Sequence, residues 1–231
     1  MFIKDLYYMV KAIARDSRPL KTCHIGITTI QGYTMLRFFT SRELATMLSI
    51  SPAKWKRWSR EFLPPDPLGG LQSGVARQFS VDEALTVFTG GHLVAELKAS
   101  IPAARQILID LQSLLQNIGF FANSRIDRRF SSGSTDPILE YTIRIYRDRH
   151  SASGEARFFY VLRGNLSGTS EEINGRKVYT KRYIEEFILP SPASLPQRLS
   201  HRTLNLSALA DFFATAVGVD KGHFPILNGR R

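Results

Sequence analysis

The sequence predicts an α+β protein with a mostly helical amino-terminal half and a small carboxyl half of strands and helix. Between residues 40 and 118, apolar residues recur every three or four positions, which is the period of amphipathic helices. From residue 139 onward they alternate with polar residues, which is typical of half-buried strands. The chain has 231 residues, 43% of them hydrophobic, so it is long enough to bury a core in one or two domains.

The first 35 residues carry weaker signals than the rest of the chain. Apolar residues at helical spacing from Ile3 to Ile13 allow a helix, but mixed charges interrupt them, so neither a secretory signal nor a membrane anchor is expected. Cys23 is the single cysteine, which excludes an internal disulfide and suits a reducing cytoplasm. We expect residues 1–35 to be a dispensable extension, because weakly anchored termini are usually poorly ordered. The alternative is that they pack on the carboxyl half.

Two short helices joined by a turn are predicted between residues 40 and 62. Thr40 and Glu43 form the S/T-x-x-E capping box that starts the first helix. Ser51 is a good N-cap for the second helix, and Pro52 suits its first position, where a missing N–H costs nothing.

The second helix separates an aromatic face from a cationic face. Its aromatic residues recur at spacings of three and four, so we expect them to face inward: Trp55, Trp58 and Phe62. Base stacking by the two tryptophans is the less favoured alternative. The cations are left for the other faces: Lys54, Lys56, Arg57 and Arg60.

Residues 63–79 are rich in Pro and Gly and predict a loop, or wing, that ends in a short strand at 75–79. Ser80 and Glu83 form another capping box, which opens a third helix. Gly90 and Gly91 are expected to interrupt or re-aim this helix.

Pro102 begins the most regular helix pattern of the chain. Its apolar residues alternate between spacings of four and three, which is typical of a seam buried on a partner: Ala104, Leu108, Leu111, Leu115 and Ile118. One possible partner is a second copy of the chain. The alternative is the chain's own carboxyl half.

The carboxyl half follows a polar linker at 123–137. Alternating residues predict strands at 139–145 and 156–164, and Asn174-Gly175 predicts a hairpin turn between short strands. Residues 181–189 fit either a short helix or a strand. A Pro-rich connector then precedes a last helix near 206–217.

The amino-terminal order of elements resembles the DNA-binding domain of the MerR-like winged helix-turn-helix family. The resemblance covers roughly residues 36–98 and is carried by "ELATMLSISPAKWKRW", "FLPPDP" and "RQFSVDEAL". The chain departs from the family at Ser49, where Gly is usual, at Trp55, where Leu is usual, and in a Gly-rich insertion in the wing.

The resemblance implies that the second helix and the wing contact duplex DNA. It points to Lys56, Arg57 and Arg60 on the helix and to Arg77 in the wing, and Lys54 on the same helix joins these candidates. It also implies that the helix after the wing pairs across a two-fold axis in a homodimer. The formal net charge of +11 independently favours a polyanionic partner.

Four segments are therefore expected. They are an extension at 1–35, the winged helix-turn-helix at 36–98, a linking or dimerisation helix at 99–122, and an α+β domain at 123–231 that senses an effector, dimerises or contacts a protein.

No metal, cofactor or enzymatic activity is expected. The mercury and copper sensors of the MerR-like family need several thiolates, and Cys23 alone cannot supply them. The paired acids Glu171-Glu172 and Glu185-Glu186 could hold a metal for nuclease chemistry, but a solvated face is the preferred interpretation. The sequence contains no Gly-rich phosphate loop and no H-E-x-x-H motif.

The expected function is that of a cytoplasmic, sequence-specific transcriptional regulator that binds double-stranded DNA, with no membrane partner. Two alternatives stay open: an excisionase-like or architectural DNA-binding accessory protein, and a nucleic-acid-processing enzyme.

Overall fold

The computed structural model describes residues 37–66, 76–122, 124, 138–148, 157–166, 168–174, 176–180, 182–188 and 200–230. Four predictions fall outside these residues: the amino-terminal extension, the tip of the wing, the polar linker and the Pro-rich connector. The described residues form a mixed α+β fold, as predicted. No helix among them is long and apolar enough to cross a membrane.

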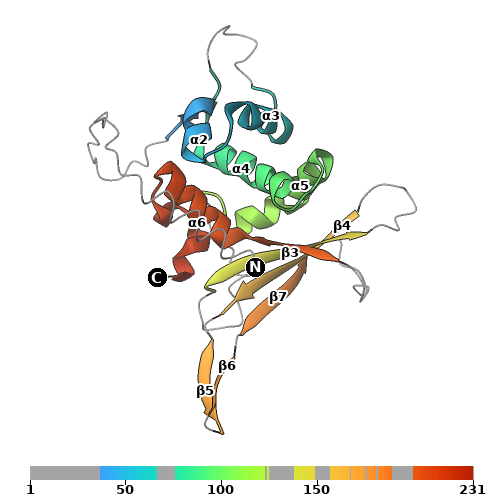
Figure 1. The fold of residues 1–231 in the computed structure, drawn as a ribbon, viewed down its shortest axis with the longest axis vertical. Coiled ribbons are helices and arrows are strands. Elements are labelled where there is room, and N and C mark those ends of the chain that lie inside the picture. The colour runs from blue at the N-terminus through green and yellow to red at the C-terminus, as the bar shows by residue number, and fades with distance from the viewer. Residues whose placement is uncertain are drawn as a thin grey trace. The chain divides into compact units, whose positions relative to one another are not determined.

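The helices begin and end close to where the sequence places them (Figure 1). They are α2 (Ser41–Met47), α3 (Pro52–Phe62), α4 (Val81–Ala95), α5 (Ile101–Asn117) and α6 (Leu206–Val217). Both predicted capping boxes are confirmed: the Thr40 and Ser80 side chains accept from the backbone N–H groups of Glu43 and Glu83, and each glutamate accepts in return. Ser51 caps α3, with Pro52 in the first turn.

The strand predicted at 75–79 is short where it is described. β2 (Gln78–Phe79) pairs antiparallel with β1 (Phe39–Thr40), which lies just before α2 and was not predicted. Phe39 and Phe79 face each other in this ladder and are both buried. The base of the wing is therefore fixed to the start of the helical region.

The prediction that Gly90 and Gly91 interrupt the third helix is wrong, because α4 runs through both. The two glycines allow α3 to approach α4 closely. A Cβ atom on Gly91 would lie 2.3 Å from the ring of Trp58, and one on Gly90 would lie 2.5 Å from the ring of Phe62. These glycines are required by packing against large aromatic rings.

The apolar seam of α5 is buried within the chain. Ala104, Leu111, Leu115 and Ile118 are all at most 2% exposed, and Leu108 is half-buried. The expectation that this seam pairs with a second copy is therefore wrong, and packing within the chain accounts for it. Tyr160 donates a hydrogen bond to the carboxylate of Asp110 on α5 (2.5 Å).

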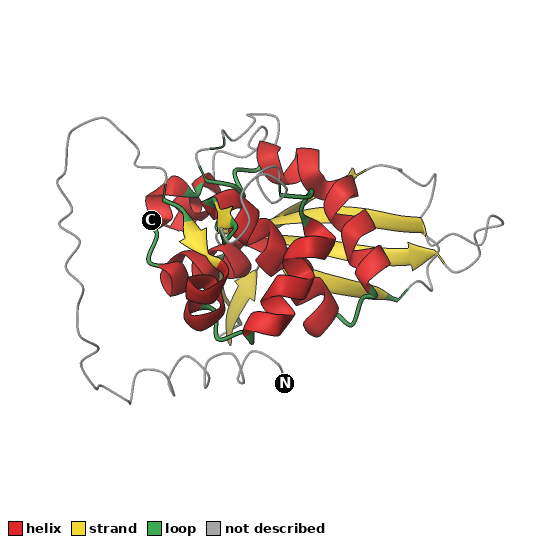
Figure 2. Ribbon diagram, turned by 90° about the horizontal axis from the view of Figure 1, so that it is seen from above, coloured by secondary structure: helices red, strands yellow, loops and turns green. Residues whose placement is uncertain are grey.

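The carboxyl half contains a four-stranded antiparallel sheet in the order β7-β4-β3-β8. Its strands are β3 (Glu140–Asp148), β4 (Arg157–Asn165), β7 (Tyr183–Ile188) and β8 (His201–Asn205). Residues 183–188 are thus a strand, which decides the alternative left open for 181–189. A separate hairpin of β5 (Thr169–Ile173) and β6 (Arg176–Thr180) turns at Asn174, as predicted. Helices cover one face of the four-stranded sheet (Figure 2).

Helix α6 connects this sheet to the amino-terminal helices. It contacts β3, α4 and α2, and the ring of Phe88 on α4 lies 5.7 Å from Phe212 and 5.8 Å from Phe213. Two short 3-10 helices, η2 (Lys221–His223) and η3 (Pro225–Arg230), complete the fold beside α6. One hydrophobic core consequently extends from Phe39 to Leu227.

Candidate nucleic-acid interface

Helix α3 is held to the rest of the protein by its aromatic face. Trp55 is fully buried and meets Phe79 of β2 edge-to-face, with ring centroids 5.9 Å apart. Trp58 is 6% exposed and covers Gly91 of α4. The structure confirms that these tryptophans face inward, so they are not available for stacking on bases.

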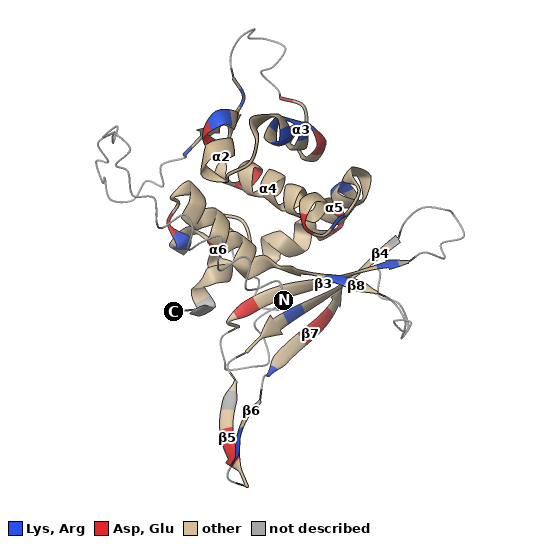
Figure 3. Ribbon diagram, viewed as in Figure 1, with Lys and Arg blue, Asp and Glu red and all other residues tan. Residues whose placement is uncertain are grey.

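The exposed part of α3 is cationic: its Lys and Arg residues are all exposed to solvent, and Figure 3 shows them as blue segments of the ribbon. We call it the cationic face, defined by Lys54, Lys56, Arg57 and Arg60. Among the described residues, none of these four side chains has an ion-pair partner. Lys54 lies over the ring of Trp58, with its ammonium nitrogen 5.7 Å from the ring centroid.

The single acid of α3 does not neutralise the cationic face. Glu61 is held by Arg105 of α5, which donates from Nη2 to the Glu61 carboxylate (2.7 Å) and from Nε to the Glu61 carbonyl oxygen (2.8 Å). This pair joins the end of α3 to α5. Because Arg105 neutralises Glu61, no acid within α3 offsets the positive charge of its four cations.

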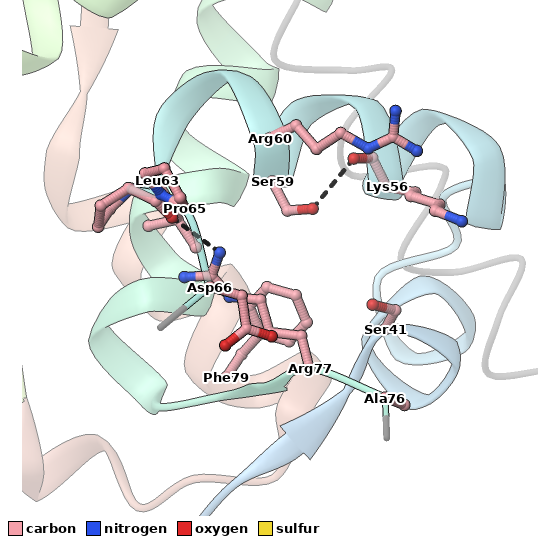
Figure 4. Close-up of a pocket in the computed structure, with 11 residues that line it drawn as sticks. Ser41, Lys56, Ser59, Arg60, Leu63, Pro65, Asp66, Ala76, Arg77 and Phe79 are labelled. Atoms are coloured by element: carbon pink, nitrogen blue, oxygen red, sulfur yellow. Dashed lines mark hydrogen bonds between the residues drawn. The ribbon is translucent and has the colours of Figure 1, made fainter. Parts of the chain in front are cut away.

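Lys56 and Arg60 line a cleft of about 640 Å³ beside α3 (Figure 4). The other walls include Ser41 at the start of α2, the segment after α3 from Leu63 to Pro65, and Ala76, Arg77 and Phe79 at the base of the wing. Asp66 contributes an acid to this lining, and it has a partner of its own. The cleft places two cations of α3 next to the start of α2 and the wing.

Arg77 is placed differently from the other candidate residues. Its Nη1 donates to the carbonyl oxygen of Pro64 (2.9 Å), and its Nη2 pairs with Glu83 Oε1 (3.1 Å). The guanidinium also lies 5.4 Å from the ring centroid of Phe79, and only 18% of the side chain is exposed. Arg77 therefore joins the exit of α3 to the start of α4 instead of presenting its charge outward.

One cation near the cleft was missed by the sequence analysis. Arg42 follows Ser41 in the first turn of α2, is exposed and has no ion-pair partner among the described residues. The available sequence signal was its position in the first turn of the predicted helix, two residues after the Thr40 N-cap. Arg37 is not comparable, since it donates to the carbonyl oxygen of Gly218 (2.9 Å).

The capping glutamate of α2 remains ionised beside these cations. Hydrogen bonds from the backbone and side chain of Thr40 lower the pKa of Glu43 below its usual value of 4.5, and Arg37 lowers it further. The negative charge of Glu43 therefore serves to cap the start of α2.

The paired acids considered for a metal do not form a site. Glu185 accepts from Arg163 and pairs with Arg144 across the sheet, and Glu171 and Glu172 are exposed on β5. In the part of the chain that the structure describes, no group of three histidine, cysteine or acidic side chains could hold a metal ion.

No family model, curated protein or solved structure matches this chain. The candidate interface consequently depends on its own geometry and charge.

Proposed function

We propose that this protein binds double-stranded DNA through the cationic face of α3 and acts as a transcriptional regulator of the winged helix-turn-helix type. The observation that carries the proposal is the arrangement of four cations without ion-pair partners among the described residues, on one exposed helix whose other side is buried. An α-helix with its side chains is about 10–12 Å across, and the major groove is about 12 Å wide, so a helix such as α3 can enter that groove.

Charge repulsion explains why this face favours a polyanion. Like charges on one helix repel each other and raise the electrostatic energy of the cationic face. Phosphate oxygens would lower that energy, and counterions condensed on the DNA would be released. Lys56, Arg57 and Arg60 are therefore proposed as DNA contacts, with Lys54 beside them and Arg42 as an added contact from α2. Arg77 supports the interface by holding the wing base to α4.

The contacts can be tested by the salt dependence of binding to a mixed-sequence duplex, since the phosphate term is independent of sequence. Alanine at Lys56, Arg57 or Arg60 is expected to reduce the slope of log K against log salt by about one unit each. Arg176→Ala is the matched control, because it removes an exposed cation from the β5–β6 hairpin. An unchanged slope in all three α3 variants would contradict the proposed interface.

The regulatory role needs a separate experiment. Selection from a random duplex pool is expected to return one preferred site, because α3 would read base edges in the major groove. Arrays of tandem sites with strong bending would favour the architectural alternative instead. A homodimer on a palindrome would have to use a surface other than the α5 seam, since that seam is buried within the chain.

A further inference from the structure

A second cavity, of about 240 Å³, lies between the α4–α5 turn and one end of the four-stranded sheet. Its apolar lining comes from Leu93 on α4, Ile107 on α5, Ile145 on β3 and Phe158 on β4. All four side chains are buried, so the floor of the cavity is part of the hydrophobic core. This cavity is distinct from the cleft beside α3.

Three cations surround this apolar floor: Lys98, Arg147 and Arg202. The strand register explains why both arginines reach it. Arg147 lies opposite Phe158, and Arg202 lies opposite Ile145, so the arginines share the sheet face on which α5 packs. Lys98 enters from the α4–α5 turn, where its backbone is left-handed and its ammonium group donates to the carbonyl oxygen of Ala95.

The charge of this cavity is unbalanced. None of the described residues that line it is acidic, and Arg147 and Arg202 have no ion-pair partner among the described residues. Ser100, the N-cap of the 17-residue helix α5, also lies in the lining and adds the positive end of a helix dipole. The field in the cavity therefore favours a negative ligand.

We propose that this cavity binds a small organic anion with an apolar body, of the class of aliphatic or aromatic carboxylic acids. The two arginines would hold the carboxylate, because a guanidinium matches carboxylate geometry with parallel hydrogen bonds. The floor of Leu93, Ile107, Ile145 and Phe158 would cover the apolar body. Ligand pockets are usually about 300–1,000 Å³, and this cavity of about 240 Å³ lies just below that range, so its volume selects a small ligand.

Other anions fit this cavity less well. Inorganic phosphate has no apolar part to cover the floor. A DNA backbone is too extended to enter a 240 Å³ cavity backed by the core. The inference does not depend on DNA binding by α3, and its test uses no DNA.

The test is titration calorimetry of the full chain with octanoate, with neutral octanamide and with inorganic phosphate. Octanoate is expected to bind saturably with a Kd below about 1 mM, and each comparison probe at least about tenfold more weakly. Equal binding of octanoate and octanamide would contradict the role of the cations. Phosphate binding as tight as octanoate would contradict an apolar body, and no saturable octanoate binding would overturn the site.

Variants locate the binding. Arg147→Ala and Arg202→Ala are each expected to weaken octanoate about tenfold or more, because each removes a charge-assisted hydrogen bond. Both arginines are exposed, so these variants should fold, and Arg176→Ala on the β5–β6 hairpin is the matched control. Ala103→Phe keeps the cations but fills the cavity, so it should abolish binding. Octanoate affinity that is unchanged in both arginine variants would place the ligand elsewhere and overturn the assignment.

Discussion

At Gly91 the backbone of α4 touches an aromatic ring of another helix. In an ordinary helix position, alanine in place of glycine stabilises by about 0.5–1 kcal/mol. Here the added Cβ would meet the Trp58 ring at 2.3 Å. We expect Gly91→Ala to lower the free energy of unfolding by about 1–3 kcal/mol, because an overpacked ring must shift. Urea unfolding measures the change, and a stabilised variant would contradict the close approach.

His92 gives the stability of the fold a pH dependence. Burial lowers the pKa of His92 below its usual 6.5, and the carboxylate of Glu96 offsets part of this shift. The unfolded chain therefore takes up a proton more readily than the folded one. This contribution to stability is complete above pH 6.5 and is lost as the pH falls below it.

The variant His92→Gln isolates this contribution. The free energy of unfolding should decrease less in the variant than in the wild type between about pH 7.5 and about pH 5.5. Chemical denaturation at the two pH values measures both decreases. Equal decreases would show that His92 does not titrate differently in the folded and unfolded states.

Single residues were predictable from the sequence where their partners are close along the chain. Thr40 and Ser80 were identified as caps because each accepts a hydrogen bond from a residue three positions later. The role of Arg77 was not predictable, because one of its partners is the carbonyl oxygen of Pro64, 13 residues away across the wing. A cation whose partner is a distant backbone carbonyl has no local sequence signal.

Between elements, Arg77 connects the loop after α3 to the first turn of α4. Both Arg77→Ala and Arg77→Lys are expected to lower the free energy of unfolding by about 1–2 kcal/mol, since lysine cannot reach both partners with one planar fork. Thermal unfolding checks the loss. The salt slope of DNA binding should stay unchanged in both variants, whereas a slope reduced only in Arg77→Ala would show that Arg77 contacts phosphate.

Elements with a strong period were predicted, and two short strands, β8 and β1, were not. α6 was expected near 206–217 and occupies Leu206–Val217, because its apolar residues follow the helical period without interruption. β8 was missed because His201, Arg202 and Thr203 are all exposed. An edge strand with one buried residue shows no alternation of apolar and polar residues. β1 is only two residues long, too short for any period to appear, whereas β2 lies within the strand expected at 75–79.

For the molecule as a whole, α6 packs against both the sheet and the amino-terminal helices, so that they share one core. Phe213 is fully buried and contacts Phe88 of α4. Phe213→Ala is expected to destabilise by about 3–5 kcal/mol. Both tryptophans lie in α3, so tryptophan fluorescence reports the helical part while far-ultraviolet circular dichroism reports the whole. The two transitions should shift together, and an unmoved fluorescence transition would indicate independently folding halves.

The sequence could not predict which surface covers the apolar seam of α5. The spacing of Leu111, Leu115 and Ile118 showed correctly that one side of α5 is covered. A second copy and the chain's own residues bury such a seam equally well, because the hydrophobic effect is not directional. Three-dimensional packing alone distinguishes them.

The position of α6 late in the chain has a consequence for protein synthesis. Helix α4 emerges from the ribosome long before the rings of Phe212 and Phe213 that cover Phe88. At about 5–20 residues per second, this delay is on the order of ten seconds. A nascent chain in that interval already carries the cations of α3 but lacks the helix that completes their support. We therefore expect prematurely terminated chains that lack α6 to bind the proposed DNA target more weakly than the finished protein does.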